Sequence, residues 1–545
     1  MGLRLLLVGF LLAALSDTRS SAQHGTANPG PGSEACARCH SEIYNSYQKT
    51  VMATASGNAK DGVITGEFDH PSSGVHYRVF QKTGNIWMSY ERRDEKKFRG
   101  QRELLYFIGS GVKGRSYLFS VDGFLFETPI QWDSQEHRWN ITPAYTEAHE
   151  SPMNLPAFVD CLNCHTSGLG PPVPGTDCKF PGKPFLYGGI TCERCHGTGD
   201  GHLEGKGPIV NPAKLSPERR DAICMECHFE GTVTVKQAGK RLYQFQPGER
   251  LADYIHYFLL PTNHERSPQS LSQFEALSMS ACQRKSGDLM WCGTCHDPHY
   301  EPSASEKAGY YRRKCITCHG DAFARKHHPD KPDCTHCHMP TLPSPDVAHT
   351  ESTDHRILRY PFNPQLVSRT AHRQLVPFPA SAAPLTSTRD LALAWETLAQ
   401  RGVDDAVGEA EANLDLAVKE NPDDPVLLSA MGYIEQQHGH SNEARDLYER
   451  ALKIDPLLND AATNLGILEA RSGNLRQAVA LWQQAFRRVP NQSAIGLNLA
   501  IAFCVAGQPA ESRTYVERVL EFNPDFGKAK QLWSNLNSNP PRCKF

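Results

Sequence analysis

Long apolar segments are scarce in this sequence of 545 residues. Its mean hydropathy is −0.49, and the one extended apolar run covers residues 5–15. That run is shorter than a membrane-spanning helix, so we expect no transmembrane span once the segment is removed. An excess of basic residues is also missing, because 57 Lys and Arg residues oppose 60 Asp and Glu residues. This balance argues against nucleic acid as a partner.

The first 22 residues have the features of a secretory signal peptide. Arg4 supplies a positive start, the apolar run follows, and Ser20, Ser21 and Ala22 precede an expected cleavage near Gln23. An uncleaved membrane anchor is the alternative. Residues 23–33 are rich in Gly, Pro and Ser and are predicted to form a linker.

Cysteine, in contrast, is abundant. Fourteen of the 18 cysteines fall in seven copies of the pattern C-x-x-C-H, which is the attachment motif of c-type haem. Two cysteines three residues apart lie on one side of a helical turn, so their sulfurs can bond to the two vinyl groups of one porphyrin. The adjoining His then binds the iron. Structural zinc is the alternative, but zinc does not explain a His after every second Cys.

The expected attachment residues and proximal ligands follow from these motifs. In chain order they are Cys36, Cys39 and His40; Cys161, Cys164 and His165; Cys192, Cys195 and His196; Cys224, Cys227 and His228; Cys292, Cys295 and His296; Cys315, Cys318 and His319; and Cys334, Cys337 and His338. We therefore predict seven covalently attached haems.

Other histidines and one methionine are candidates for the second axial position on the iron. Spacing to a motif favours His202, His299 and His349, with His327 or His328 next. Met52 follows His40 by twelve residues and could bind the first haem, or only pack against the ring. Lower in this ranking are His149, His256, His264, His355, His70 and His76.

Two regions of different pattern make up residues 23–385. Residues 62–145 contain short β-branched and aromatic runs separated by Gly-containing turns, which predicts an antiparallel sheet. Residues 146–385 are rich in Pro and Gly, and there we expect short helices and an interior built by haem. The expected fold class is a haem-organised, mainly α and coil multihaem cytochrome domain with a small antiparallel β insertion.

The C-terminal region, 389–540, repeats with a period of 34 residues. The period is carried by Pro422, Pro456, Pro490 and Pro524, and by Gly439, Gly473 and Gly507. The copy MGYIEQQHGHSNEARDLYERALKIDP resembles the tetratricopeptide repeat. This predicts an all-α solenoid of four units with a capping helix near 525–537. Such arrays bind a partner protein or peptide, and a rigid spacer or a dimer surface is the alternative.

Four cysteines lie outside the motifs. Cys504 is in an apolar helical run and is expected in the core, and Cys543 is in a Pro-rich tail and is expected to be exposed. Cys178 and Cys282 could form a disulfide, although nothing in the sequence brings them together.

The haem region resembles the multihaem cytochromes c of the tetrahaem nitrification cytochrome and octahaem hydroxylamine-oxidoreductase-like group. The stretches that carry the resemblance are ACARCHSEIYNSY, GGITCERCHGTGDGH, CGTCHDPH and CTHCHMP with DVAHTESTDHRI. The resemblance implies His202 and His349 as second ligands. The chain departs from the family at Met52, where related chains often carry a His. It also has no C-x-x-C-K variant, so the lysine-ligated haem of the pentahaem nitrite reductases is absent.

Two functions fit these features. The first is electron transfer along the haems between redox partner proteins, in a bacterial periplasm or at the outer surface, because c-type haem is attached outside the cytoplasm. The second is an oxidoreductase in which one haem keeps an open position for nitrite, hydroxylamine or peroxide. A docking scaffold is a weaker third idea. Electron transfer is favoured because no acid–base constellation stands beside a motif, and no catalytic residue can be named.

Overall fold

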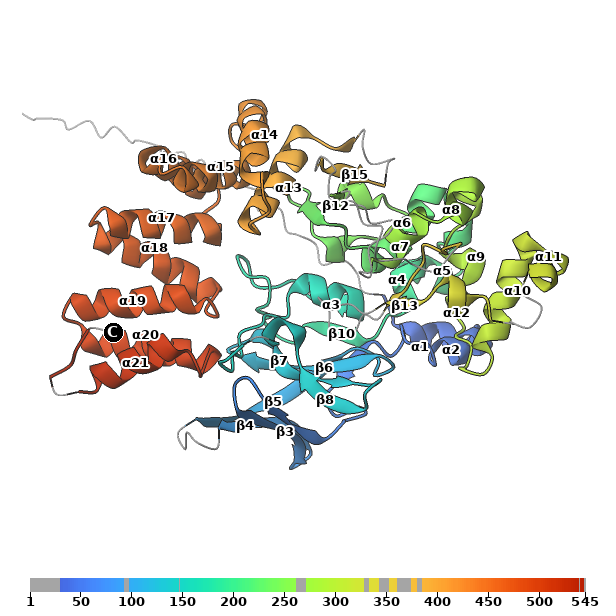
Figure 1. Ribbon diagram of the computed structural model, residues 1–545, viewed down its shortest axis with the longest axis horizontal. Helices are drawn as coiled ribbons and strands as arrows, with labels where there is room; N and C mark the ends of the chain where they lie inside the picture. Colours follow the sequence, from blue (N-terminus) through green and yellow to red (C-terminus); the bar gives the residue numbers. More distant parts are fainter. Residues whose placement is uncertain are drawn as a thin grey trace, which may run out of the picture.

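The chain is described here by a computed structural model that covers residues 30–92, 98–146, 148–260, 271–327, 333–342, 352–359, 374–379, 385–538 and 540–543. The expected signal peptide, His264, His328 and His349 lie outside the described residues. The described part forms a β-sheet body, a region of short helices and coil, and a C-terminal stack of paired helices (Figure 1). None of the described helices has the length and apolarity needed to cross a membrane.

An eight-stranded antiparallel sheet forms the first body. Strands β2 to β8 are neighbours in chain order, and β1 pairs with β5. Along β3, the buried Val75, Tyr77 and Val79 alternate with more exposed residues, as expected for a strand with one face in a core. The strands are β1 (Ser56–Asn58), β2 (Gly66–His70), β3 (Val75–Lys82), β4 (Asn85–Arg92), β5 (Arg99–Ile108), β6 (Gly114–Val121), β7 (Phe124–Asp133) and β8 (Arg138–Ile141).

This sheet curls into a near-barrel with an interior of its own. Strand β2 returns beside β8, where a methyl group added at Gly66 would lie 2.7 Å from the Trp139 ring. Tyr77, Phe119 and Phe126 fill the interior. The expectation of a small insertion in a mainly α and coil domain is therefore wrong, because this body has its own aromatic core. The short runs in the sequence could not show that the first and last strands meet.

The haem-motif region consists of short helices joined by coil and three small sheets. The helices are α1 (Ser33–Ala37), α2 (Ser41–Tyr47), α3 (Val159–His165), α4 (Glu193–His196), α5 (Asp200–Leu203), α6 (Pro217–His228), α7 (Gln273–Ser278), α8 (Ala281–Ser286), α9 (Cys292–Cys295), α10 (Lys307–His319), α11 (Asp321–His327) and α12 (Thr335–His338). The sheets pair β9 (Thr166–Leu169) with β10 (Phe185–Gly188), β11 (Val233–Lys236) with β12 (Ile255–Leu259) and β15 (Val376–Phe378), and β13 (Thr341–Leu342) with β14 (Ser352–Thr353).

The C-terminal region is an all-α array of tetratricopeptide-like repeats. Its helices are α13 (Thr388–Gln400), α14 (Ala406–Glu420), α15 (Pro425–Gln437), α16 (Ser441–Ile454), α17 (Asn459–Arg471), α18 (Leu475–Arg488), α19 (Ser493–Val505), α20 (Pro509–Phe522) and α21 (Gly527–Leu536). Within the pair α15–α16, a methyl group at Gly432 would lie 2.9 Å from the Tyr448 ring. In the next pair, α17–α18, a methyl group at Gly466 would likewise lie against the Trp482 ring. Glycine therefore lets the paired helices approach, and the aromatic residue fills the space.

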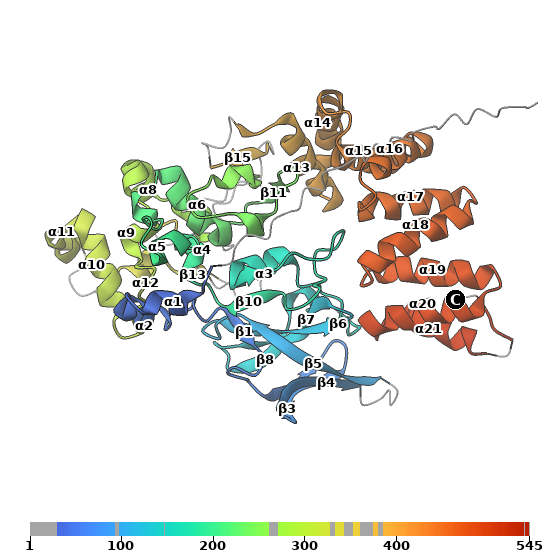
Figure 2. The same ribbon diagram turned by 180° about the vertical axis from the view of Figure 1, so that it is seen from behind.

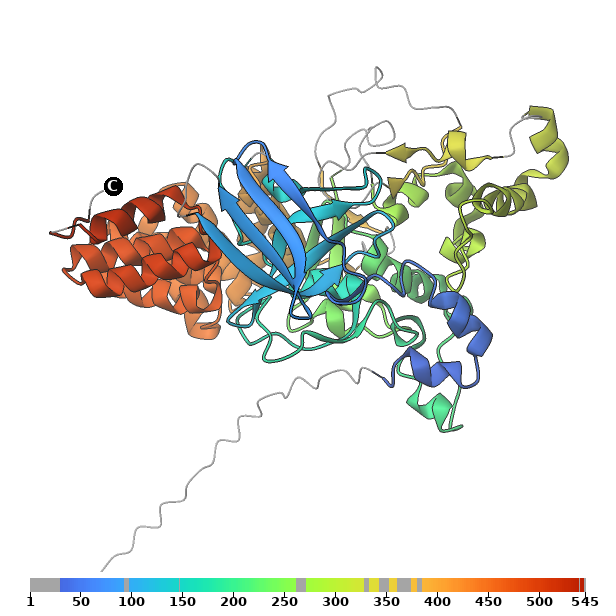
Figure 3. The same cartoon turned by 90° about the horizontal axis from the view of Figure 1, so that it is seen from below.

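The repeat array packs against the rest of the chain at both of its ends (Figure 2). At the C-terminal end, Asp525 pairs with Arg92 of β4 and accepts a hydrogen bond from the Ser151 amide at 2.9 Å. At the N-terminal end, Asp390 of α13 accepts hydrogen bonds at 2.9 Å from Gln237 Nε2 and is 2.9 Å from His256 Nδ1 of β12. The view from below shows the array beside the near-barrel (Figure 3).

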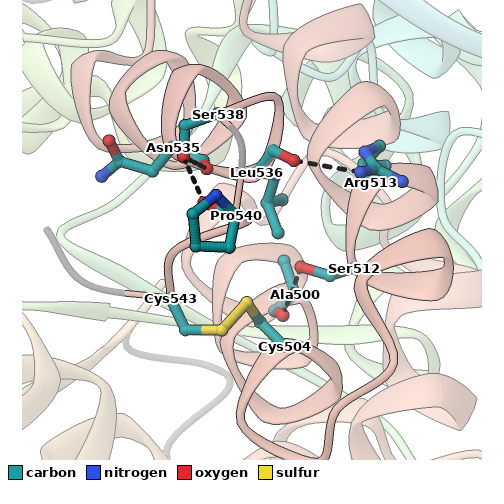
Figure 4. Close-up of a disulfide and its surroundings, with 9 residues drawn as sticks. All are labelled: Ala500, Cys504, Ser512, Arg513, Asn535, Leu536, Ser538, Pro540 and Cys543. Carbon is teal, nitrogen blue, oxygen red and sulfur yellow. Dashed lines mark hydrogen bonds between the residues drawn. A yellow bond between two sulfur atoms is a disulfide. The ribbon is translucent and has the colours of Figure 1, made fainter.

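A disulfide joins Cys504 of α19 to Cys543 in the C-terminal tail (Figure 4). Ser538 Oγ adds a hydrogen bond of 2.8 Å to the Pro540 carbonyl, and Arg513 donates one of 3.0 Å to the Leu536 carbonyl. The tail is thus tied to the last repeat. Cys504 is buried in the core, as expected, although it is also disulfide-bonded. Cys543 is half-buried against the core of the array, so the expectation that it is exposed is wrong. Cys178 and Cys282 are both free thiols, so they do not form the disulfide considered for them.

The packing of the repeat array against the near-barrel can be tested at Phe522. Its ring, 1% exposed, lies at the end of α20 inside the core of the sheet, 5.3 Å from the Phe126 ring centroid. Replacing Phe522 with Ala should lower the free energy of unfolding by about 3–5 kcal/mol, because a buried aromatic ring is lost and a cavity remains. Urea unfolding measures this change. Leu416→Ala, at an exposed position on α14, is the control and should change it by less than about 0.5 kcal/mol; equal effects would contradict the packing.

The free energy of unfolding is predicted to depend on pH through the carboxyl group of Glu396 in α13. Burial raises the pKa of its carboxyl from 4.5 to about 7, although Gln400 donates a hydrogen bond to it. The folded state therefore holds this proton more tightly than the unfolded state does. The contribution is fully present below pH 4.5 and is lost as the pH rises to 7. Glu396→Gln should recover up to about 3 kcal/mol at neutral pH and nothing in acid. Unfolding curves at several pH values would test this, with the exposed Glu409→Gln as a control that keeps the wild-type slope.

Candidate functional site

Each of the seven motifs forms a helical turn, and we number them 1 to 7 in chain order. Motifs 2, 4 and 6 end helices α3, α6 and α10, and the others form or border the short helices α1, α4, α9 and α12. The backbone amide of the motif His bonds to the carbonyl of the first Cys, for example His196 to Cys192 at 2.9 Å and His338 to Cys334 at 3.1 Å. This turn places both sulfurs on one side and the imidazole just beyond them.

All fourteen motif cysteines are free thiols. Desolvation raises the pKa of the Cys195 thiol to about 12.

Thiols of different motifs lie next to one another. The thiols that influence each other's pKa as near neighbours are Cys36 of motif 1 with Cys192 of motif 3, Cys164 of motif 2 with Cys227 of motif 4, Cys224 of motif 4 with Cys292 of motif 5, and Cys315 of motif 6 with Cys334 of motif 7. Cys195 of motif 3 also faces Cys227, and Cys295 of motif 5 faces Cys318 of motif 6. The motifs thus form one connected array, in which motif 4 adjoins motifs 2, 3 and 5.

Three motif histidines face a second histidine ring. The ring centroids are 6.4 Å apart for His40 and His202, 5.9 Å for His196 and His299, and 6.1 Å for His296 and His355, with interplanar angles of 17°, 14° and 29°. A metal held between two imidazoles at about 2.0–2.1 Å from each nitrogen requires centroids about 6.3 Å apart. These pairs therefore have the separation needed to hold one iron each.

Hydrogen bonds orient two of these pairs. His196 Nδ1 is 2.8 Å from the Val210 carbonyl oxygen, and His299 Nδ1 is 3.5 Å from Asp297 Oδ1. In the other pair, His355 Nδ1 is 2.7 Å from the Thr353 carbonyl oxygen, and His296 Nδ1 is 3.2 Å from Tyr311 Oη. An imidazole that gives its Nδ1 proton to an oxygen presents Nε2 to a metal, which is how ligating histidines are usually fixed.

The other motif histidines have varied surroundings. His338 Nδ1 is 2.6 Å from the Leu358 carbonyl oxygen, so it has the same orientation as the paired rings. His228 retains an exposed surface, although desolvation by the surrounding segments lowers its pKa. Beyond His319, Phe323 lies between the motif and His327, with ring centroids 5.9 Å and 4.3 Å away from the two histidines.

The positions of the predicted second ligands can be compared with these pairs. His202 and His299 each face a motif ring, but His202 faces motif 1 and His299 faces motif 3, neither of which is the motif that precedes it in the sequence. Met52 is linked to motif 3 through its backbone, because its carbonyl oxygen accepts a 2.9 Å hydrogen bond from Ile190. His349 lies outside the described residues.

His355 has a low rank by sequence spacing, yet its ring lies beside a motif histidine. It lies 17 residues after His338 in the sequence but faces His296 of motif 5. Three other histidines of low rank have carboxylate or hydroxyl partners: His256 contacts Asp390 of the repeat array, His70 contacts Ser73 at 2.8 Å, and His76 contacts Asp69 at 2.9 Å. Spacing along the chain carries little information here, because a second ligand comes from another segment.

Comparison with known proteins gives one family match. Residues 131–197 match the model of the family "Cytochrome c554 and c-prime". The matched segment contains motifs 2 and 3 with their helices α3 and α4. A search of curated proteins gives no match.

Solved structures resemble the chain only over part of its length. A fragment of MamA from Desulfovibrio magneticus is 18% identical and covers 28% of this chain and 88% of that one, with a TM-score of 0.25. The PilF protein of Pseudomonas aeruginosa is 20% identical and covers 28% and 69%, with a TM-score of 0.25. A tetratricopeptide repeat protein from Parabacteroides merdae is 18% identical and covers 27% and 58%, with a TM-score of 0.24. The assignment of the repeats rests on the period and the paired helices of the chain itself.

The cysteine pairs, the opposed imidazoles and the family match lead to one statement of what this part of the chain is. Residues 131–197 carry a domain that matches the cytochrome c554 and c-prime family, which implies covalently bound haem c in this part of the chain.

Proposed function

We propose that the chain is an exported multihaem c-type cytochrome that transfers electrons along seven covalently bound haems. The observation that carries the proposal is the set of three opposed imidazole pairs at motifs 1, 3 and 5, with ring centroids 5.9–6.4 Å apart. An iron with two protein ligands has no position open for a substrate, which favours electron transfer over catalysis at these motifs.

Each proposed haem is attached and ligated by residues of the motifs and by histidines from other segments. The cysteines of each motif hold the porphyrin through two thioethers, and the motif histidines supply the first axial nitrogen. The second nitrogen comes from His202 at motif 1, His299 at motif 3 and His355 at motif 5. Haem c supplies a one-electron carrier whose potential depends on these ligands and on burial. The hydrogen bonds at Nδ1 of His196 and His355 keep each ring in the orientation that offers Nε2.

The contacts between motif cysteines support a continuous path for electrons. Adjacent thiols connect motifs 1, 3, 4, 5, 6 and 7 in that order, with motif 2 joined to motif 4. Haems attached at adjoining sulfurs would lie close together, so each electron would have a near neighbour to move to. The chain positions the carriers.

We propose a second role for the repeat array, which is to dock a protein partner while bracing the cytochrome part. A cleft of about 580 Å³ lies between the array and the near-barrel, lined among others by Phe486, Tyr515, Arg487 and Arg518. Aromatic and Arg side chains of this kind dominate the binding energy of protein interfaces. Asp390 contacts Gln237 of the haem-motif region, and Asp525 contacts Arg92 of the near-barrel, and these contacts support the bracing role.

Export to the periplasm or the outer surface of a bacterium is part of the proposal. The signal-like residues 1–22, the many thiols to be converted to thioethers, and the Cys504–Cys543 disulfide all fit an oxidising compartment.

A multihaem oxidoreductase is the second candidate, and one cavity favours it. The cavity, of about 420 Å³, is lined by Tyr106, Arg115, Lys183 and Ser56 among others. Ser56 Oγ donates a 2.7 Å hydrogen bond to the His165 carbonyl, so the cavity borders motif 2. Its two cations suit a small anion such as nitrite, and an open position on the iron of motif 2 would make it a substrate pocket.

Haem content and spin state test the proposed function. The purified protein, made in a host that matures c-type cytochromes, should be red and heavier than its polypeptide by seven haems. Electron paramagnetic resonance of the oxidised protein should show low-spin signals only, and the visible spectrum should not change when nitrite or cyanide is added. A strong high-spin signal that cyanide removes would support the oxidoreductase instead. A colourless, folded protein of bare polypeptide mass would contradict both.

The second ligand of the motif 1 haem can be tested separately. His202→Ala should convert one low-spin signal to high-spin, because the ring opposite His40 is removed. Met52→Ala should leave the spectrum and the redox titration unchanged. His149→Ala, at an exposed position outside these pairs, is the matched control. If instead Met52→Ala lowered one potential and His202→Ala did nothing, Met52 would be the ligand.

A further inference from the structure

Motifs 2, 3 and 4 are joined by side chains that the haem-attachment pattern leaves unspecified. The residue just before the second Cys is Asn163 in motif 2, Arg194 in motif 3 and Glu226 in motif 4. These three residues are far apart in the sequence, yet their side chains meet. We call them the triad.

The triad is a closed set of hydrogen bonds. Arg194 Nη2 donates to Glu226 Oε1 at 2.7 Å and to Asn163 Oδ1 at 3.2 Å. Asn163 Nδ2 donates to the same Glu226 oxygen at 3.0 Å. Arg194 also donates to the Asn163 backbone carbonyl at 3.1 Å. Each member therefore contacts both of the others, and helices α3, α4 and α6 are held to one point.

Both charges of the triad are removed from water. Asn163 is 1% exposed and Glu226 is 3% exposed, and the Arg194 side chain is 15% exposed. A buried carboxylate and guanidinium are tolerated because each compensates the charge of the other, and loss of one leaves the other uncompensated. Charges in such a site act over longer distances than they would in water.

The triad also lies among the haem attachment points. Each member directly precedes the second cysteine of its motif, and two of these cysteines, Cys164 and Cys227, are near neighbours. Cys195 faces Cys227 as well. Cys164 Sγ is 3.7 Å from the Glu226 carbonyl oxygen, which it approaches as a donor. The ion pair therefore lies where the haems of motifs 2, 3 and 4 come together.

We propose that the triad is a positioning element that sets the spacing of the haems at motifs 2, 3 and 4 and tunes their reduction potentials through the balance between Arg194 and Glu226. The inference rests on the proposed function, because it requires haem at these motifs. Reduction of an iron adds a negative charge. An uncompensated guanidinium therefore favours the reduced state, and an uncompensated carboxylate disfavours it.

Variants that neutralise one charge of the triad test the proposal by redox titration of the haem-loaded protein. Glu226→Gln keeps the size and an acceptor oxygen but removes the negative charge, so the potentials of a subset of haems should rise. Arg194→Gln should lower the potentials of the same subset. A tenfold change in the ratio of reduced to oxidised haem is expected in each case, which is about 59 mV for a one-electron couple. The double variant should return close to the wild-type values.

The controls separate this role from a purely structural one. Glu218→Gln makes the same chemical change on the exposed side of α6 and should shift nothing. Arg194→Lys keeps the charge and should restore most of the potential lost in Arg194→Gln. Shifts of the same sign in the two single variants, or fully loaded variants with unchanged potentials, would overturn the proposal.

Haem loading gives a second readout if a variant matures poorly. Mass spectrometry of haem peptides should then show losses confined to motifs 2, 3 and 4, which supports the positioning role. Losses at motifs 6 or 7 with motifs 2 to 4 intact would contradict it. Wild-type protein without haem would overturn the proposed function itself, whereas haem-loaded variants that behave like the wild type would overturn only the role of the triad.

Discussion

The meeting of motif cysteines from separate segments is the constraint on which the rest of the cytochrome part depends. The helices that carry them are short, and several comprise a single turn, such as α4 and α9. Turns of this length are not stable by themselves, because forming the first turn costs more conformational entropy than one hydrogen bond returns. Their arrangement therefore depends on contacts between motifs, such as those of Arg194 with Glu226 and Asn163, and on the covalent haems that we propose for them.

The near-barrel and the repeat array are each organised around a hydrophobic core. Each has an interior of its own, made by aromatic rings such as Phe119 and Phe126 in the sheet and by Tyr448 against Gly432 in the array. The region of short helices and coil has a smaller hydrophobic cluster, which includes Phe229, Phe245 and Tyr257. All three parts of the chain therefore bury apolar side chains, and the near-barrel and the repeat array lie beside the motif region as supports.

The motifs and the 34-residue period could be predicted from sequence because both are local patterns. The pairing of histidines could not, since His355 reaches motif 5 and His202 reaches motif 1 from segments distant in the sequence. The disulfide was missed for the same reason: Cys504 and Cys543 are 39 residues apart, and only the fold brings the tail back to α19. The scale of the sheet was also missed, because closure of β2 onto β8 depends on the curvature of the whole sheet and not on any one strand.

The position of motif 4 has a consequence for how damage would spread through the proposed array. Its cysteines adjoin those of motifs 2, 3 and 5, whereas the cysteines of motif 7 adjoin those of motif 6. Motif 4 is therefore a branch point that connects several motifs, and motif 7 is an end that is connected to one motif only. Failure to load the last carrier would only shorten the circuit. Failure at motif 4 would separate motifs 5, 6 and 7 from the rest, and motifs 2 and 3 would stay joined through Arg194 and Asn163.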